Sequence, residues 1–186
     1  MKTKIFMLVL ALQCAWILGT TCQQERVLRA GKIILLETER VDPRDPLRGD
    51  YLILNYKIST VRTNLFSPPL PKDLRDGTAV YVALAPRGEF YEAVRASLQP
   101  IAAGGDEIML RGRSGWTGSF ASWRGNLPGG IHVEYGLEHF FVHEGTGNPS
   151  GKLTVQVAVP VSGRASLKQV FVAGKPYAEA MKPKGD

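Results

Sequence analysis

The chain has 186 residues, which is enough for one domain with its own hydrophobic core. The net charge is +6, but the basic residues are scattered and do not alternate with aromatic residues, which argues against nucleic-acid binding. Both cysteines, Cys14 and Cys22, precede residue 30, so the region after it can hold neither a disulfide nor a cysteine-based metal site.

Residues 1–24 predict a membrane anchor or signal segment. Lys2 and Lys4 precede an apolar run over residues 5–18. As a helix, the segment to residue 21 would rise about 25 Å, close to the ~30 Å hydrocarbon core of a bilayer. A cleaved signal is the alternative, but Gly19-Thr20-Thr21 is a poor cleavage site, so we favour a retained single-pass anchor. A lipoprotein signal ending at Cys22 is a lesser option.

Orientation follows from the charges around this segment. The lysines before it favour a cytoplasmic N-terminus, whereas Arg26, Arg29 and Lys32 beyond it oppose that arrangement. Because the N-terminal tail is short, we expect the N-terminus to remain in the cytoplasm and the C-terminal domain to lie on the other side of the membrane. We therefore expect a bacterial inner or cytoplasmic membrane protein with an extracytoplasmic domain.

The region after residue 30 begins with predicted strands. Residues 33–36 are all apolar, which indicates a strand buried on both faces. Residues 51–58 form the clearest alternating strand. Leu54 and Tyr56 share one face and are expected in the core, whereas Tyr51 lies on the opposite face at the strand entrance. A hairpin is predicted from residues 78–84 and 89–94, joined by Pro86-Arg87-Gly88.

The second half continues this pattern with one exception. Residues 107–111 predict a strand, and the glycine-rich residues 112–130 a long loop or irregular hairpin. Residues 131–135 alternate as a further strand. Leu137, Phe140 and Phe141 recur at helical spacing and predict one short helix. A final strand pair is expected at 153–159 and 165–172.

These elements amount to eight or nine strands and little helix. They predict a mainly β fold, an antiparallel sandwich or barrel-like domain with one short helix, preceded by a single N-terminal transmembrane helix. The β domain is expected over residues 30–178 and a flexible tail over residues 179–186.

Two sequence motifs point to a family. Asp42-Pro43-Arg44-Asp45 leads into Gly49-Asp50-Tyr51-x-x-Leu54-x-Tyr56, and Tyr135-Gly136-Leu137-Glu138 runs into Phe141-Val142-x-Glu144-Gly145-x-Gly147. With the apolar span before them and a closing strand pair that carries Gly163-Arg164-Ala165, these motifs resemble the bacterial GDYXXLXY family. The resemblance implies small membrane-anchored proteins without an established activity, found in the company of other integral membrane proteins. We take the motif residues as structural or interaction residues.

A catalytic role for the first motif finds little support. Gly49 and Asp50 have the ordinary chemistry of a turn before a strand. Residues 46–54 also resemble the segment after the nucleophile of type I signal peptidases, but Val41 or Asp42 stands where the serine is needed. We infer no peptidase activity, although a shared architecture is possible.

The histidines and tryptophans offer only weak evidence for a metal or glycan site. His139 and His143 would share a helix face, and His132 lies on a nearby strand, but the metalloprotease pattern His-Glu-x-x-His does not occur. Trp116 and Trp123 could stack on sugars from the glycine-rich loop, yet large aromatics more often complete a core. We expect no cofactor, no metal ion and no catalytic residue.

The sequence favours a non-enzymatic, membrane-anchored extracytoplasmic domain that serves as an accessory or assembly module. Its expected partner is an integral membrane protein, and its ligand is unknown. An envelope hydrolase is the alternative, and it requires Asp50 to meet Glu138 or Glu144 in one open cleft. A cell-wall or glycan-binding module is the third hypothesis, and it requires both indoles to be exposed and coplanar.

Overall fold

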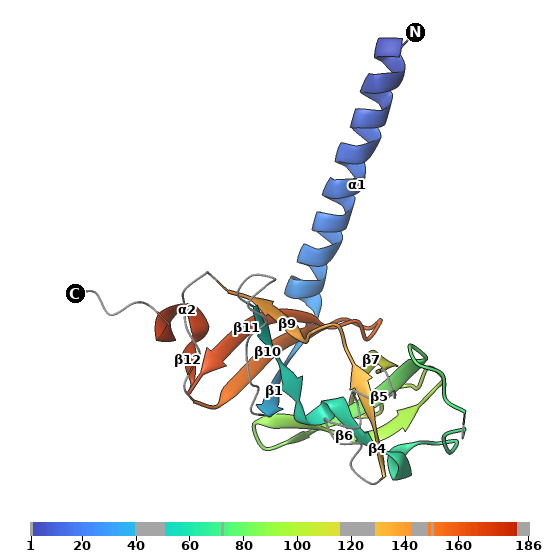
Figure 1. Cartoon of the computed structure of the whole chain (residues 1–186), viewed down its shortest axis with the longest axis vertical. Coiled ribbons are helices and arrows are strands. Elements are labelled where there is room, and N and C mark those ends of the chain that lie inside the picture. The colour runs from blue at the N-terminus through green and yellow to red at the C-terminus, as the bar shows by residue number, and fades with distance from the viewer. Residues whose placement is uncertain are drawn as a thin grey trace, which may run out of the picture.

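The computed structural model describes residues 2–39, 51–71, 73–115, 129–142, 149 and 151–181. A single helix, α1 (Lys2–Ala30), projects from one end of a β-rich domain (Figure 1). Its apolar side chains are exposed all round, with Trp16 75% and Leu12 72% exposed. Within the described residues it is the one helix long and apolar enough to cross a membrane.

Twelve strands are described, most of them short. One five-stranded sheet has the order β12-β11-β10-β1-β3, another the order β4-β8-β7-β5-β6, and β2 pairs with β9 alone. The bounds are β1 (Lys32–Glu39), β2 (Tyr51–Ile53), β3 (Asn55–Tyr56), β4 (Thr60–Arg62), β5 (Ala79–Arg87), β6 (Phe90–Ser97), β7 (Ile108–Ser114), β8 (Gly130–Glu134), β9 (His139–Phe141), β10 (Leu153–Val159), β11 (Ser166–Val172) and β12 (Lys175–Pro176).

The described pairings between strands are antiparallel, as expected from the hairpin signals. The second sheet curls back on itself. After β4 and the 3₁₀ turn η2 (Thr63–Leu65), Phe66 forms a parallel bridge to Ala96 of β6, and the Ser67 N–H donates to the Ala96 carbonyl at 3.0 Å. Because β4 and β6 are the two edges of that sheet, this bridge makes the domain barrel-like.

One hydrophobic core joins the sheets. Leu36 of β1, Leu84 of β5, Leu110 of β7 and Val155 of β10 are all fully buried. The expected strands 153–159 and 165–172 are found as β10 and β11, and the expected hairpin is β5–β6, although Pro86 and Arg87 belong to β5 and its turn is Gly88-Glu89. The mainly β fold class is therefore confirmed.

Two local predictions were wrong. The first strand is buried on one face only, because Ile34 and Leu36 point to the core while Ile33 is 36% exposed and Leu35 half-buried. The segment predicted as a helix at residues 137–141 instead contains strand β9, since pairing with β2 satisfies its backbone and so short a helix gains little stability of its own. The described domain does contain one short helix, α2 (Tyr177–Ala180), which crosses the expected boundary between the β domain and the flexible tail at residues 178–179.

The predicted strand over residues 51–58 has the right faces but is interrupted. Leu52, Leu54, Tyr56 and Ile58 are all buried, as the alternation indicated. The chain pairs with β9 as β2, switches at Leu54 to pair with β1 as β3, and then turns through η1 (Lys57–Ser59). One alternating segment thus connects three parts of the fold.

Candidate functional site

The two sequence motifs lie against each other. Tyr51 is paired with Phe141, Leu52 with Phe140 and Ile53 with His139. The next residue, Leu54, donates its N–H to the Glu138 carbonyl at 2.7 Å. Segments more than eighty residues apart in the sequence therefore form one ribbon, which the sequence motifs alone did not predict.

Two buried tyrosines join the motifs reciprocally. The Tyr56 hydroxyl donates to the Leu137 carbonyl at 2.8 Å, and the Tyr135 hydroxyl donates to the Ile58 carbonyl, also at 2.8 Å. Tyr56 is 0% exposed and Tyr135 is 6% exposed. Burial, and secondarily the nearby charge of Glu138, raises the pKa of both hydroxyls. Both groups therefore remain protonated donors that satisfy buried carbonyls.

Glu138 serves the turn between β8 and β9. Its carboxylate accepts the Tyr135 N–H at 2.6 Å, and Gly136 has a φ of +78°, which an L side chain rarely adopts. The carboxylate is thus engaged with backbone three residues away. Glu138 therefore caps this turn, which explains why a glutamate and a glycine occur together in the second motif.

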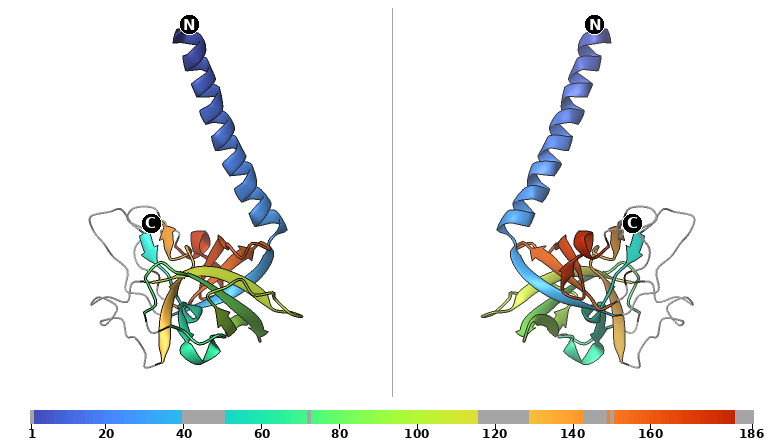
Figure 2. Two further views of the ribbon diagram at one scale, coloured as in Figure 1. Left: turned by 90° about the vertical axis from the view of Figure 1, so that its right-hand side faces the viewer. Right: turned by 90° about the vertical axis from the view of Figure 1, so that its left-hand side faces the viewer.

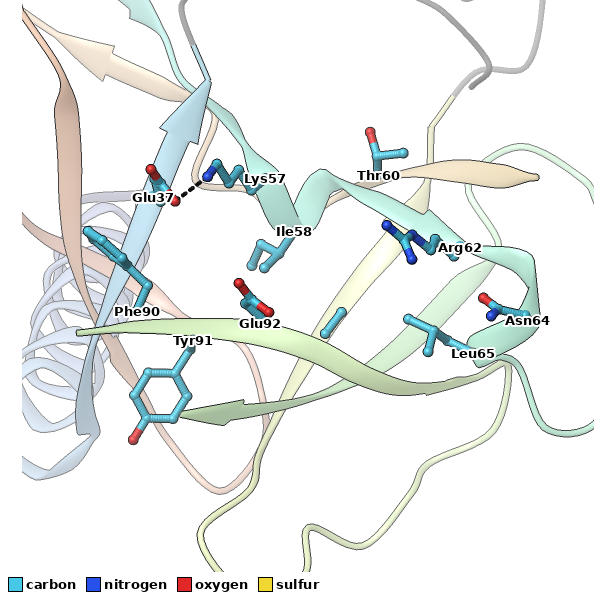
Figure 3. A pocket seen from close by; sticks show the side chains of 11 residues that line it. Glu37, Lys57, Ile58, Thr60, Arg62, Asn64, Leu65, Phe90, Tyr91 and Glu92 are labelled. Atoms are coloured by element: carbon cyan, nitrogen blue, oxygen red, sulfur yellow. Dashed lines mark ion pairs between the residues drawn. The ribbon is translucent and has the colours of Figure 1, made fainter. Parts of the chain in front are cut away.

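A groove opens beside the place where the two motif segments meet (Figure 3). It has a volume of about 320 Å³ and lies between β1, the η1–β4–η2 segment and β6. The Phe66–Ala96 bridge joins this segment to the end of β6, and the groove lies toward the start of β6. The lining residues are Glu37, Lys57, Ile58, Thr60, Arg62, Asn64, Leu65, Phe90, Tyr91, Glu92 and Ala93. Four of them also border a second hollow, which extends to Gly129 and Gly130.

The free edge of β6 forms one wall of this groove. β6 pairs with β5, and no described strand pairs with its other edge over residues 90–93. The β5–β6 turn has two residues, so its closing pair, Arg87 and Phe90, is hydrogen-bonded. The next pair, Pro86 and Tyr91, is then non-hydrogen-bonded, which agrees with the missing N–H of proline. By the same alternation, the backbone N–H and C=O of Tyr91 and Ala93 point to the groove.

Charges of both signs surround the opening. Glu37 forms ion pairs with Lys57, at 2.5 Å, and with Lys152, whose ammonium lies 4.9 Å from the centre of the Phe90 ring. The hydrogen bonds from Lys152 and then Lys57 hold the pKa of Glu37 below its ordinary value. Arg62 and Glu92 are exposed on opposite walls, and Figure 3 shows Glu92 rising from β6 into the opening.

The contacts between the two motif segments position the wall of the groove that η1 forms. Lys57 and Ile58 follow directly after Tyr56, the last motif residue, and the Ile58 carbonyl is held by the Tyr135 hydroxyl. The buried motif tyrosines therefore fix the backbone from which Lys57 reaches Glu37. No sequence signal for the groove was recognised, because its walls come from distant segments. The hairpin predicted from the sequence includes β6, which forms one wall, but nothing in the sequence indicated that one edge of β6 is unpaired.

Several predicted residues lie outside the part of the chain that the structure describes. These residues are Asp42, Pro43, Arg44, Gly49, Asp50, Trp116, Trp123, His143, Glu144 and Gly145. The hydrolase and glycan hypotheses both depend on them and stay predictions. His132 and His139 lie on β8 and β9, so the helix face assumed for His139 does not exist. Within the described ranges, no three His, Cys, Asp or Glu side chains gather to hold a metal ion.

Comparison with known proteins gives one match. A family model described as GDYXXLXY protein matches residues 13–170, from inside the apolar run of α1 to near the end of β11. The matched region includes both paired motifs and the groove. No curated protein and no solved structure matches the chain.

Proposed function

The chain belongs to the GDYXXLXY family, and from this premise we propose that it is a membrane-anchored interaction module whose groove binds an extended segment of a partner protein. The partner is an integral membrane protein or another envelope protein, and the module acts as its accessory or assembly subunit. The observation that carries the proposal is the free edge of β6, where the backbone groups of Tyr91 and Ala93 face an open groove.

Retention of α1 as an anchor is supported by three features. Its apolar side chains are exposed on all sides, which suits lipid. The family match begins at residue 13, inside this helix. Residues 19–21, the poor cleavage site, lie in the helix interior, and the helix continues to Ala30, where it meets the domain.

A scaffold role for the paired motifs accounts for the family signature without a reaction. Leu54, Tyr56, Tyr135 and Glu138 are all used in core packing or in hydrogen bonds to backbone. Through the bond from Tyr135 to the Ile58 carbonyl, they fix the backbone of η1, which faces β6 across the groove. The signature then marks a frame around a binding groove.

A polypeptide strand is the ligand that suits this groove best. Unpaired N–H and C=O groups on a strand edge give affinity for any extended chain, and flanking side chains select among sequences. Here the flanking groups are Arg62, Glu92 and Lys57, together with the apolar Leu65 and Phe90. A partner segment with charges of both signs and a few apolar residues would match them.

Site-specific crosslinking tests the proposal. A photoreactive amino acid is placed at Glu92, inside the groove, and in a matched variant at Glu89, an exposed residue of the β5–β6 turn. Both full-length variants are irradiated in native membranes. We expect a discrete adduct with one envelope or membrane protein from position 92 and none from position 89. Equal adducts from both positions, or none from position 92, would contradict the groove as the binding site.

A further inference from the structure

The helix α1 contacts the β domain directly, with no linker between them. The Gly31 N–H donates to the Val27 carbonyl at 2.9 Å, and the Gln24 side-chain amide donates to the Ser166 hydroxyl at 3.0 Å. A Cβ at Gly31 would come within 2.6 Å of the Val27 oxygen and 3.0 Å of the Val159 nitrogen. Both are backbone atoms, so the close approach of helix and β10 requires glycine. The direction of α1 therefore determines which face of the domain lies nearest the bilayer.

The length of α1 places that face at the lipid headgroups. About twenty residues, from residue 5 to residue 24, cross a hydrocarbon core of ~30 Å. Only six helical residues then remain before Gly31, a rise of about 9 Å, against a headgroup layer of roughly 5–8 Å. Because Gln24 already contacts Ser166 of β11, the domain begins beside this last part of the helix, at the depth of the headgroups, with no spacer between them.

The large apolar residues that the described domain exposes gather on this side. They are Val161, 100% exposed, Phe141, 77% exposed, and Ile33, 36% exposed. Val161 lies in the β10–β11 turn, next to the α1 junction because Lys32 pairs with Val159. β2 and β9, which ends at Phe141, lie at the level of the α1 base in all views, whereas η2 lies at the opposite end (Figures 1 and 2).

Basic residues accompany the apolar ones. Arg26 near the end of α1, Lys32 at the start of β1 and Arg164 after the β10–β11 turn are exposed around the junction. Cations at this depth are attracted to anionic headgroups, and exposed apolar side chains next to a bilayer gain free energy by entering the interface.

We propose that the domain rests on the membrane surface through this face, defined by Ile33, the β10–β11 turn with Val161, and the end of β9 with Phe141. Its occupant is the lipid surface that α1 already spans. The contact holds the domain in one orientation, with η2 and the adjoining part of the groove wall on the side remote from the lipid. The inference rests on the proposed retention of α1 but not on the proposed partner.

Fluorescent labelling in nanodiscs tests this orientation. The full chain, with Cys14 and Cys22 replaced by alanine, receives a single cysteine at Phe141, at Val161 or, as a control, at the exposed Asn64 of η2. Each is labelled with an environment-sensitive dye and reconstituted in phosphatidylcholine and phosphatidylglycerol. The dye is then quenched either by headgroup spin-labelled lipid or by aqueous iodide.

We expect a blue-shifted emission and strong quenching by spin-labelled lipid at positions 141 and 161, and quenching by iodide alone at position 64. A position 141 dye that iodide quenches as strongly as the control overturns the proposal, and so does a dye shielded from both quenchers, because that result indicates a protein contact. Failure of the full chain to co-elute with nanodiscs would instead contradict the anchor itself.

Discussion

At the scale of single residues, the buried hydroxyls of Tyr56 and Tyr135 decide how the motif segments meet. Each satisfies a main-chain carbonyl that would otherwise lie in the core without a donor. Phenylalanine has the right shape for either position but leaves that carbonyl unpaired. The tyrosine that closes the GDYXXLXY motif, Tyr56, thus serves hydrogen bonding to backbone, and Tyr135 does the same from the other segment.

Replacing either tyrosine should weaken the fold. We expect Tyr56→Phe and Tyr135→Phe each to lower the free energy of unfolding by about 1–3 kcal/mol, the usual cost of an unsatisfied buried polar group. Chemical denaturation of the full chain in detergent micelles measures the change. Tyr91→Phe makes the same chemical change on a half-buried ring and should be nearly neutral. Equal losses at all three positions would refute the assigned role of the two hydrogen bonds.

The ion pairs of Glu37 predict a pH dependence. Because the lysines lower the pKa of Glu37 in the folded state, its stabilising contribution is present above the ordinary value of 4.5 and is lost as the pH falls through the folded-state value. Between about pH 5 and pH 3, the wild type should lose more stability than Glu37→Gln. Denaturation midpoints across this range test the sign. Parallel loss in both proteins would rule out a pKa shift at Glu37.

At the scale of elements, hydrophobic alternation predicts which face of a strand is buried, whereas the pairing between strands decides where each strand lies in the fold. Period-two alternation predicted β8, β10 and the faces of residues 51–58, and the turn after β10 predicted β11. It failed at residues 137–141, where three apolar residues fit helical spacing but the partner strand β2 decides the structure. The groove depends on which edges of a sheet meet, and local pattern holds no information about that.

The free edge of β6 should be visible in amide exchange. If the Tyr91 and Ala93 N–H groups face the groove while those of Phe90 and Glu92 bond to β5, exchange rates should alternate along residues 90–93. Hydrogen exchange followed by NMR on the full chain in nanodiscs resolves these four amides. Uniform slow exchange would mean that another segment already covers this edge, and the proposed binding site would be lost.

At the scale of the whole molecule, the junction at Gly31 links the orientation of the domain to that of the membrane helix. Gly31→Ala forces a Cβ against two backbone atoms, whereas Gly19→Ala meets nothing within 4 Å. We expect the first substitution, and not the second, to shift or broaden the distance distribution between spin labels at Lys4 and Asn64 in a cysteine-free background. Pulsed EPR in nanodiscs measures it. An unchanged distribution in Gly31→Ala would show that Gly31 does not fix the orientation of α1 relative to the domain.

The central claim is that paired motifs frame a groove through which an anchored module binds its partner. Purification of the tagged full chain from native membranes tests it most directly, with wild type, Glu92→Lys and Glu89→Lys compared at matched abundance. The two variants make the same charge change three residues apart, inside the groove and outside it. The account predicts one envelope or integral membrane protein with wild type and Glu89→Lys that is lost with Glu92→Lys. Retention of that protein by Glu92→Lys, or no specific partner with wild type, would contradict the account.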